Sequence, residues 1–443
     1  MKTSDFIFDN HTLIDLQLIS DGKNNLCVFD LFNNTHTYGG NLSLLYMFKR
    51  PFCDDKLINQ RIGLLKEIEI NGLGFEIEKE AIDFIEFYLS LSKPPVRFSC
   101  FIALANKIDQ MIKPTNDYYV IQRGVIFIIE LVNSLYKFAS SNIDQKNRSD
   151  LLRDLSEQII DLITYEDLEE ILTERTITKL TIFETQKLDH FFRFLYKDKI
   201  NALLSIVYQL DVFNSIVLTK KKYNFVYPEI SENQNIQIEG LHHPLIVALV
   251  KNNLILDEDQ NVCFFTGANM AGKSTFMKAF GIAVYLAHLG FPVPVAMMKL
   301  PVFNGLLATI NLSDNQSLGY SHFYAEVKRL KFIAENLATS SKMVIIIDEL
   351  FRGTNNYDSH ESTLAVVKAF SQTNDNLFLV SSHLPDVARE LADIPNVTLK
   401  CFISNIENED FVYSYKIKDG ISDDRYGMRI LKKEKIIELI GQE

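Results

Sequence analysis

The sequence predicts a chain of two parts: an all-α domain over residues 1–222 and an α/β domain with a mostly parallel sheet over residues 223–443. Two observations predict this division. The amino-terminal part shows apolar residues at three- and four-residue spacing, which is typical of amphipathic helices. The carboxyl-terminal part alternates such patterns with short, wholly apolar runs, and parallel strands that are buried on both faces require runs of that kind.

Helical periodicity recurs throughout the first part. It is found in residues 78–93, 120–139, 148–163 and about 184–217, with breaks at Pro94-Pro95, Pro114 and polar turns. None of these segments contains a catalytic motif. A plain helical bundle with a mechanical role is therefore the simplest interpretation of this part.

The first apolar run of the second part, Val262–Thr266, leads directly into a phosphate-binding loop. The pattern Gly-x-x-x-x-Gly-Lys-Ser occupies residues 267–274, and a helical pattern follows over residues 275–288. The backbone N–H groups of such a loop close around phosphate oxygens, to which the helix N-terminus adds partial positive charge. We expect Lys273 to reach the β- and γ-phosphates and the Ser274 hydroxyl to ligate Mg²⁺.

Two further apolar runs end in polar residues that hydrolysis of a nucleotide can use. Asp348 and Glu349 follow the run 343–347, and His383 follows the run 377–380 after two serines. The carboxyl ends of parallel strands form the crevice in which α/β sheets bind ligands. Asp348 is then placed to hold Mg²⁺ through water, Glu349 to orient or deprotonate the attacking water, and His383 to hydrogen-bond the γ-phosphate or that water.

These motifs together resemble the MutS family of DNA mismatch-repair ATPases. The segment TGANMAGKST is similar to the phosphate loop of that family and departs from it only at Ala268 and Ala271. DELFRGTNNYDS, SSHLPDV and EGLHHPLI resemble the family's acidic strand, its histidine strand and its entry to the ATPase domain. The matching residues of these three segments are Arg352, Gly353, Thr354, Tyr357, Asp358, His383, His243 and Pro244.

The resemblance implies a P-loop ATPase domain of the ABC type that hydrolyses ATP with the help of Mg²⁺. It assigns catalysis to Glu349 and His383 and the metal ion to Ser274 and Asp348. It assigns nucleotide binding to Gly267, Asn269, Met270, Gly272, Lys273, Ser274 and Thr275. No aromatic residue occurs near residues 250–253, where the family often supplies a ring to stack on adenine, so loose base selectivity is expected.

Residues 310–333 resemble the signature loop of the family and the helix that follows it. In the family this loop reaches across a dimer and completes the ATP site of the partner, so the resemblance implies a homodimer with composite sites. The candidate residues for this contact are Ser317, Gly319 and Ser321. Leu318 separates Ser317 from Gly319, whereas mismatch-repair members usually have serine directly before glycine, which leaves open which residue acts in trans.

The resemblance extends into the helical part of the chain. Residues 26–68 are similar to the start of the MutS lever region, with Thr37, Gly40 and Pro51 in the expected order, and residues 210–230 look like its last helix. It covers about residues 25–430. It implies a short member of the family with a lever domain and an ATPase domain but no mismatch-reading, connector or clamp domain.

The expected function is that of a MutS-like, DNA-dependent ATPase of DNA repair, which couples ATP hydrolysis in a dimer to lever movement on mismatched, branched or duplex DNA. The net charge of −12 is unfavourable for such binding, because contacts to DNA phosphates need clustered Lys and Arg. The alternative is an ATP-switched module that binds a protein partner and does not contact DNA directly. An ABC-type ATPase of chromosome maintenance is disfavoured, because the Leu-Ser-Gly-Gly signature is missing.

Composition also bears on the location of the protein. No apolar run approaches the roughly 18 residues of a membrane span, and the first residues lack a signal-peptide pattern. The five cysteines are scattered without a Cys-x-x-Cys pair, so neither a zinc site nor a disulfide framework is supported. A cytoplasmic protein with reduced cysteines and no membrane partner is expected.

Overall fold

The computed structural model describes residues 5–20, 22, 25–91, 116–143, 148–164, 180–247, 250–310, 322–373, 375–407, 410–422 and 439–440. The chain divides into two compact units. The first, which we call the α/β unit, consists of Met1–Leu31, Arg50–Asn59 and Lys220–Glu443, and the second, the helical unit, consists of Phe32–Lys49 and Gln60–Thr219. This differs from a single boundary at residue 222, because two amino-terminal stretches pack with the carboxyl-terminal unit.

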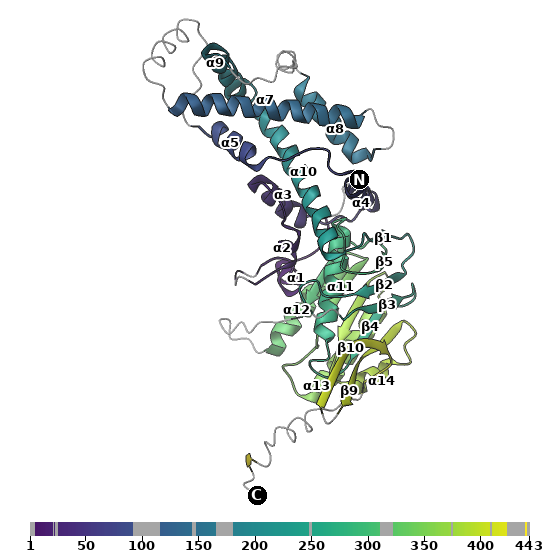
Figure 1. Ribbon diagram of the computed structural model, residues 1–443. Coiled ribbons are helices and arrows are strands. Elements are labelled where there is room, and N and C mark those ends of the chain that lie inside the picture. Colours follow the sequence, from purple (N-terminus) through teal and green to yellow (C-terminus); the bar gives the residue numbers. More distant parts are fainter. Residues whose placement is uncertain are drawn as a thin grey trace. The chain divides into compact units, whose positions relative to one another are not determined.

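The helical unit is built from helices of different lengths, of which α7 and α10 are long (Figure 1). Its elements are α3 (Tyr38–Phe48), α5 (Lys79–Leu89), α7 (Asn116–Ile143), α8 (Asp150–Ile163), α9 (Ile182–His190) and the π-helix η1 (Phe191–Leu195), with most of α4 (Asp55–Asn71) and of α10 (Lys197–Tyr223). The face of α8 shows why these segments pack. Leu152, Leu155, Ile159 and Ile163 recur every three or four residues and are buried, and α8 packs along α7.

A buried carboxylate fixes the start of α3 in this unit. Asp211 of α10 is fully buried and accepts hydrogen bonds from the backbone N–H groups of His36 (3.0 Å) and Thr37 (2.9 Å) and from the Thr37 hydroxyl (2.8 Å). The same hydroxyl caps α3 by accepting from the Gly40 N–H. Burial of the Asp211 charge is compatible with folding because these donors replace water.

In the part of the chain that the structure describes, two helices are long and apolar enough to span a membrane, which the sequence pattern did not lead us to expect. They are Tyr118–Ile143 within α7 and Lys197–Tyr223, which is α10. Core helices of globular proteins meet the same criteria. Within the protein, 67% of the apolar window of α10 and 39% of that of α7 are buried.

The α/β unit has the mixed class that the sequence predicts. Its larger described sheet has the strand order β10-β9-β4-β8-β7-β6, in which β10 is antiparallel to β9 and the other pairs are parallel. These strands are β4 (Val262–Thr266), β6 (Gly305–Thr309), β7 (Met343–Ile347), β8 (Leu377–Ser381), β9 (Val397–Glu407) and β10 (Asp410–Asp419). A smaller sheet has the order β1-β5-β2-β3, with β1 (Glu229–Ile230), β2 (Ile236–Leu241), β3 (Asn252–Leu256) and β5 (Met297–Leu300).

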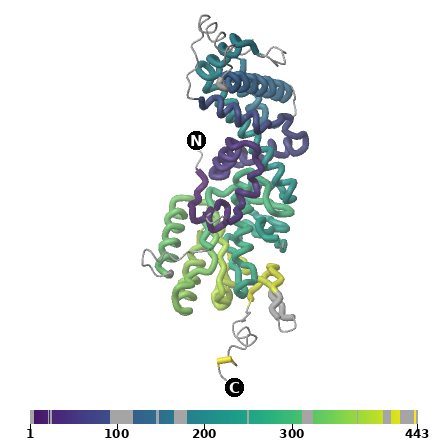
Figure 2. Tube along the Cα trace, turned by 60° about the vertical axis from the view of Figure 1, so that its left-hand side comes forward, coloured from purple at the N-terminus to yellow at the C-terminus, as the bar shows by residue number. Residues whose placement is uncertain are grey.

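The core of this unit lies on both faces of the larger sheet. Every residue of β4, β6, β7 and β8 is buried, as the wholly apolar runs require. The helices of the unit are α1 (Asn10–Asp15), α2 (Val28–Phe32, all but its last residue), α11 (Lys273–His288), α12 (His322–Thr339), α13 (Asn356–Ser371) and α14 (Pro385–Leu391). Figure 2 shows the purple amino-terminal segment beside the green elements of this unit, far from it in sequence.

Strand order determines where functional side chains meet. β8 lies between β4 and β7, and the three strands are parallel, so the segments that follow them all begin at the carboxyl ends of the strands, side by side. Those segments contain Lys273, Asp348, Glu349 and His383.

Candidate nucleotide-binding site

The loop between β4 and α11 turns tightly through residues 267–272. Gly267 and Gly272 have φ angles of 148° and 105°, a region that side chains rarely adopt, and Met270 has a φ of 67°. A Cβ atom on Gly267 would lie 3.3 Å from the Cβ atom of Phe402, so close packing against β9 also favours glycine there. The loop ends at Gly272, which caps α11.

Lys273, the first residue of α11, extends back into this loop. Its side chain is only 4% exposed, and Nζ donates hydrogen bonds to the carbonyl oxygens of Gly267 (2.7 Å) and Ala268 (3.1 Å). The same atom lies 3.8 Å from Oε1 of Glu349. Burial lowers the pKa of Lys273, and the nearby charges of Glu349 and Asp348 oppose that shift. The strands thus bring the ammonium of the loop and the acidic pair together.

Asp348 is held by two hydroxyl groups from different elements. Ser274 Oγ of α11 donates to one carboxylate oxygen, and Ser381 Oγ at the end of β8 donates to the other. Hydroxyl and carboxylate oxygens are ligands that suit Mg²⁺, which is usually held by one or two protein groups together with substrate phosphates and water. Within the described ranges no group of three or more His, Cys, Asp and Glu side chains could hold a metal, so Ser274 and Asp348 fit Mg²⁺ only in this shared manner.

Glu349 is held in an unusual backbone conformation beside Asp348. Its φ is 55°, and its N–H donates to Ser381 Oγ (3.1 Å). Its carboxylate, 10% exposed, accepts from Nε of Arg352 at 2.5 Å. A non-glycine residue with a left-handed backbone costs free energy that its surroundings must offset, and such residues cluster at functional sites. Ser381 thus bonds both the carboxylate of Asp348 and the backbone of Glu349.

His383 follows β8 and lies close enough to the site for its charges to act on the imidazole. Partial burial lowers the pKa of His383; the positive charges of Lys273 and Arg352 act in the same direction, and Glu349 opposes them. The imidazole is therefore neutral near pH 7. A neutral ring can both donate and accept a hydrogen bond, which suits a group that orients water or phosphate.

A cavity of about 310 Å³ adjoins the loop on the side of the smaller sheet. Its walls come from β2 and the residues after it, β3, α11 and β10, and they include His242, Ile246, Thr275, Phe276 and Tyr415. Such a concave, largely apolar lining suits a planar base. No aromatic residue occurs near residues 250–253, but the lining of this cavity includes Tyr415, which lies in an irregular part of β10 between Tyr413 and Ile417.

Asn252 attaches β3 to β10 beside this ring. Its side-chain amide donates to the carbonyl oxygen of Tyr415 (2.9 Å), and its Oδ1 accepts from the Ile417 N–H (3.0 Å). Neither Ser381 nor Tyr415 was assigned a role from the sequence. The position of Ser381 directly after a buried apolar run could have indicated a role at the site. Tyr415 lies far from the loop in the sequence, and no local pattern connects the two.

The remaining predicted residues fall in several places. Asn269, Met270, Ser274 and Thr275 are exposed around the loop, and Met270 is 80% exposed. His243 is buried in the segment after β2, where burial lowers its pKa to about 4. Gly353, Thr354, Tyr357 and Asp358 lie around the start of α13, and Pro244 follows His243. Ser317, Gly319 and Ser321 lie outside the described residues.

Comparisons with known proteins point to the MutS family. The family model of MutS domain V matches residues 263–440. The DNA mismatch repair protein MutS of Staphylococcus haemolyticus (strain JCSC1435) is 29% identical over 247 residues, which cover 54% of this chain and 27% of that protein. The protein of the same name from Staphylococcus aureus (strain JH9) is 28% identical over 247 residues, covering 54% of this chain and 28% of the relative. The chain thus spans less than a third of these relatives' own length, and the part of it that matches the MutS family model is residues 263–440, domain V.

Proposed function

We propose that this chain binds ATP with Mg²⁺ at the loop of residues 267–274 and hydrolyses it to ADP and phosphate. The single observation that carries the proposal is the meeting of Lys273, Ser274, Asp348 and Glu349 at one edge of the sheet. Lys273 would hold the phosphates as a point charge in a buried setting, where electrostatic attraction is stronger than in water. Ser274 and Asp348 would hold Mg²⁺, which neutralises charge on the phosphate oxygens.

In this proposal Glu349 takes the role of the base. Arg352 fixes one of its carboxylate oxygens at 2.5 Å, and the other, 3.8 Å from Lys273, faces the region where the phosphates would bind. Glu349 would orient or deprotonate a water molecule for attack, and neutral His383 would hydrogen-bond that water or the γ-phosphate. The adenine base of ATP would occupy the cavity beside Tyr415, with the tyrosine ring against the face of the adenine.

We further propose that the chain works as a cytoplasmic homodimer in which ATP binding and hydrolysis change how the helical unit engages DNA. The support for this part is the match of residues 263–440 to the MutS family model together with the names of the relatives, which are DNA mismatch repair proteins. Coupling of this kind requires the DNA-bound and free states to differ in nucleotide affinity. The loop that contains Ser317, Gly319 and Ser321 would complete the site of the partner subunit.

The test is steady-state ATP hydrolysis with and without homoduplex, mismatched and branched DNA, at low and moderate salt. The proposal predicts hydrolysis that is absent in Lys273→Ala, that differs among the DNAs, and that responds less to DNA as salt rises, because phosphate contacts release counterions. Hydrolysis that ignores every DNA would leave the ATPase in place and refute the DNA part. It would favour the alternative of a protein partner, which the net charge of −12 also suits.

A further inference from the structure

The amino-terminal segment, residues 5–18, covers the free edge of the larger sheet. β6 is the edge strand, and its outward N–H groups recur at every second residue. Three successive donors find acceptors in the segment: Leu306 donates to the Ile7 carbonyl oxygen (2.8 Å), Ala308 to Thr12 Oγ1 (2.9 Å) and Ile310 to Asp15 Oδ2 (2.6 Å). The segment thus supplies one acceptor for each of these three backbone N–H groups.

The same segment also packs against α11, the helix that begins at Lys273. Leu16 is fully buried, and a Cβ atom on Gly281 of α11 would lie 2.7 Å from its Cδ2 atom, so the two segments are in close contact. Phe6 packs edge-on against Tyr285 of α11 with ring centroids 6.3 Å apart. The amino-terminal segment is therefore fixed to β6 and α11 of the α/β unit, independently of its contacts with α12.

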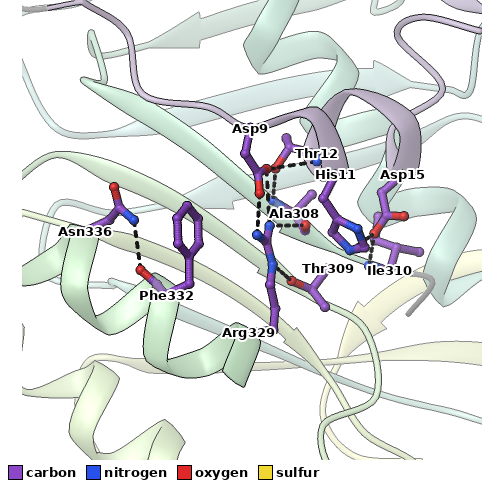
Figure 3. A network of polar contacts seen from close by, with 10 residues as sticks. All are labelled: Asp9, His11, Thr12, Asp15, Ala308, Thr309, Ile310, Arg329, Phe332 and Asn336. Atoms are coloured by element: carbon purple, nitrogen blue, oxygen red, sulfur yellow. Dashed lines mark hydrogen bonds and ion pairs between the residues drawn. The ribbon is translucent and has the colours of Figure 1, made fainter. Parts of the chain in front are cut away.

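Arg329 of α12 joins three parts of this region (Figure 3). Its side chain is 11% exposed; Nε donates to Thr309 Oγ1 (2.9 Å), and Nη2 donates to the Ala308 carbonyl oxygen (2.9 Å). The guanidinium also makes a two-pronged ion pair with Asp9, whose own side chain caps α1 by accepting from the Thr12 N–H (3.0 Å). A bidentate pair between planar groups fixes orientation as well as distance.

About one turn before Arg329, α12 contacts the segment that follows β7 and contains Glu349 and Arg352. Glu326, 9% exposed, accepts a hydrogen bond from the backbone N–H of Arg352 (3.2 Å). The Arg352 guanidinium in turn holds the Glu349 carboxylate at 2.5 Å. Phe323 of α12 packs on Phe351 of that segment, with ring centroids 5.6 Å apart. A continuous set of contacts therefore leads from Asp9 through α12 to the proposed base.

We propose that the amino-terminal segment is a positioning element for the catalytic carboxylate, and that Asp9, Arg329 and Glu326 are positioning residues that act on Glu349 through Arg352. Glu349 stands in a left-handed backbone conformation that needs support from its surroundings. Helix α12 supplies part of that support, and the Asp9–Arg329 pair sets where α12 lies. The inference rests on the proposed ATPase and adds a role for a part of the chain to which the nucleotide site assigns none.

The test separates turnover from nucleotide binding. We expect Arg329→Gln to lower kcat for ATP about tenfold, because small displacements of a catalytic group cost one to two orders of magnitude in rate, while nucleotide affinity stays within about twofold. Asp9→Asn, which keeps the size of the side chain, should lower kcat in the same selective way. Affinity is measured with a fluorescent ADP analogue and folding with far-UV circular dichroism.

Lys331→Gln is the matched control on the same helix. Lys331 is 75% exposed and pairs only loosely with Glu335, at 3.7 Å, so its kcat should equal that of the wild type. The double variant Arg329→Gln/Glu326→Met tests the route itself. If both residues act through Arg352, the kcat of the double variant should be no lower than that of the less active single variant, because that single substitution already removes the shared interaction.

Three results would overturn the inference: unchanged kcat in both Asp9→Asn and Arg329→Gln, a loss of nucleotide affinity in proportion to kcat, or single effects that multiply in the double variant. Failure of the underlying ATPase would look different. In that case the wild type would hydrolyse no more ATP than Lys273→Ala, and both proposals would fall together. Active wild type with unaffected Arg329→Gln and Asp9→Asn would refute the positioning role alone.

Discussion

Replacing Ser381 by alanine tests how the Asp348 carboxylate and the Glu349 backbone are held. Ser381 is fully buried, its hydroxyl donates to Asp348, and the same oxygen accepts from the Glu349 N–H at 3.1 Å. Loss of a hydrogen bond to a charged group costs about 1.5–3 kcal/mol, and a backbone N–H left without a partner costs about 1 kcal/mol. Ser381→Ala should therefore lower the free energy of unfolding by roughly 2.5–4 kcal/mol.

The same substitution should act on turnover more than on binding. The Asp348 carboxylate keeps its hydrogen bond from Ser274 but loses the one from Ser381, and Glu349 loses a bond that supports its left-handed backbone, so we expect kcat to fall about ten- to a hundredfold. Stability is followed by far-UV circular dichroism in urea, because the chain has no tryptophan. Ser371→Ala removes only a local bond to Lys368 and serves as the control. If Ser381→Ala matches Ser371→Ala in both stability and kcat, the geometry of the acidic pair does not depend on this hydroxyl.

Two further predictions concern the base cavity and the core. Tyr415→Ala should weaken ATP binding by about 1–3 kcal/mol in calorimetry, because base stacking on an aromatic ring is worth that much, whereas Tyr415→Phe should bind normally; equal affinities of all three proteins would remove the base from this cavity. His288 is fully buried, its Nε2 accepts from the Phe303 N–H (2.9 Å), its Nδ1 lies 2.8 Å from the Val284 carbonyl oxygen, and burial lowers its pKa from 6.5 to about 4. Below pH 6.5 the unfolded chain takes up a proton that folded His288 does not, so the free energy of unfolding should fall by up to roughly 3 kcal/mol as the pH drops to about 4. In His288→Gln, which cannot titrate, the free energy of unfolding should fall less steeply with pH. An identical pH dependence in the two proteins would contradict this role of His288.

Local patterns in the sequence were sufficient to predict the elements around the nucleotide site. The runs 262–265, 343–347 and 377–380 are wholly apolar, and all of their residues are buried in β4, β7 and β8. Their order in the sheet then brings Lys273 to within 3.8 Å of Glu349. The apolar runs and the glycines of the loop predict these elements because both act within a few residues of the chain.

Features that depend on distant parts of the chain were not predictable in this way. Tyr415 reaches the cavity because β10 folds back antiparallel on β9 and is irregular after Tyr413, and no local pattern fixes that geometry. The pairing of Asp9 with Arg329 joins residues 320 positions apart. The amino-terminal residues that pack in the α/β unit were placed in the helical part for the same reason: a short segment that covers a sheet edge has no periodicity of its own.

The central claim is that Glu349 acts as the base in a site where Lys273 holds the phosphates. The most direct measurement is phosphate release from saturating ATP by Glu349→Gln, with ATP binding measured on the same preparation and Lys273→Ala beside it. We predict that Glu349→Gln binds ATP as the wild type does but releases phosphate at least about 100-fold more slowly, because a positioned base contributes two to four orders of magnitude, whereas Lys273→Ala should bind no ATP. Phosphate release by Glu349→Gln at the wild-type rate would contradict the assignment of the base.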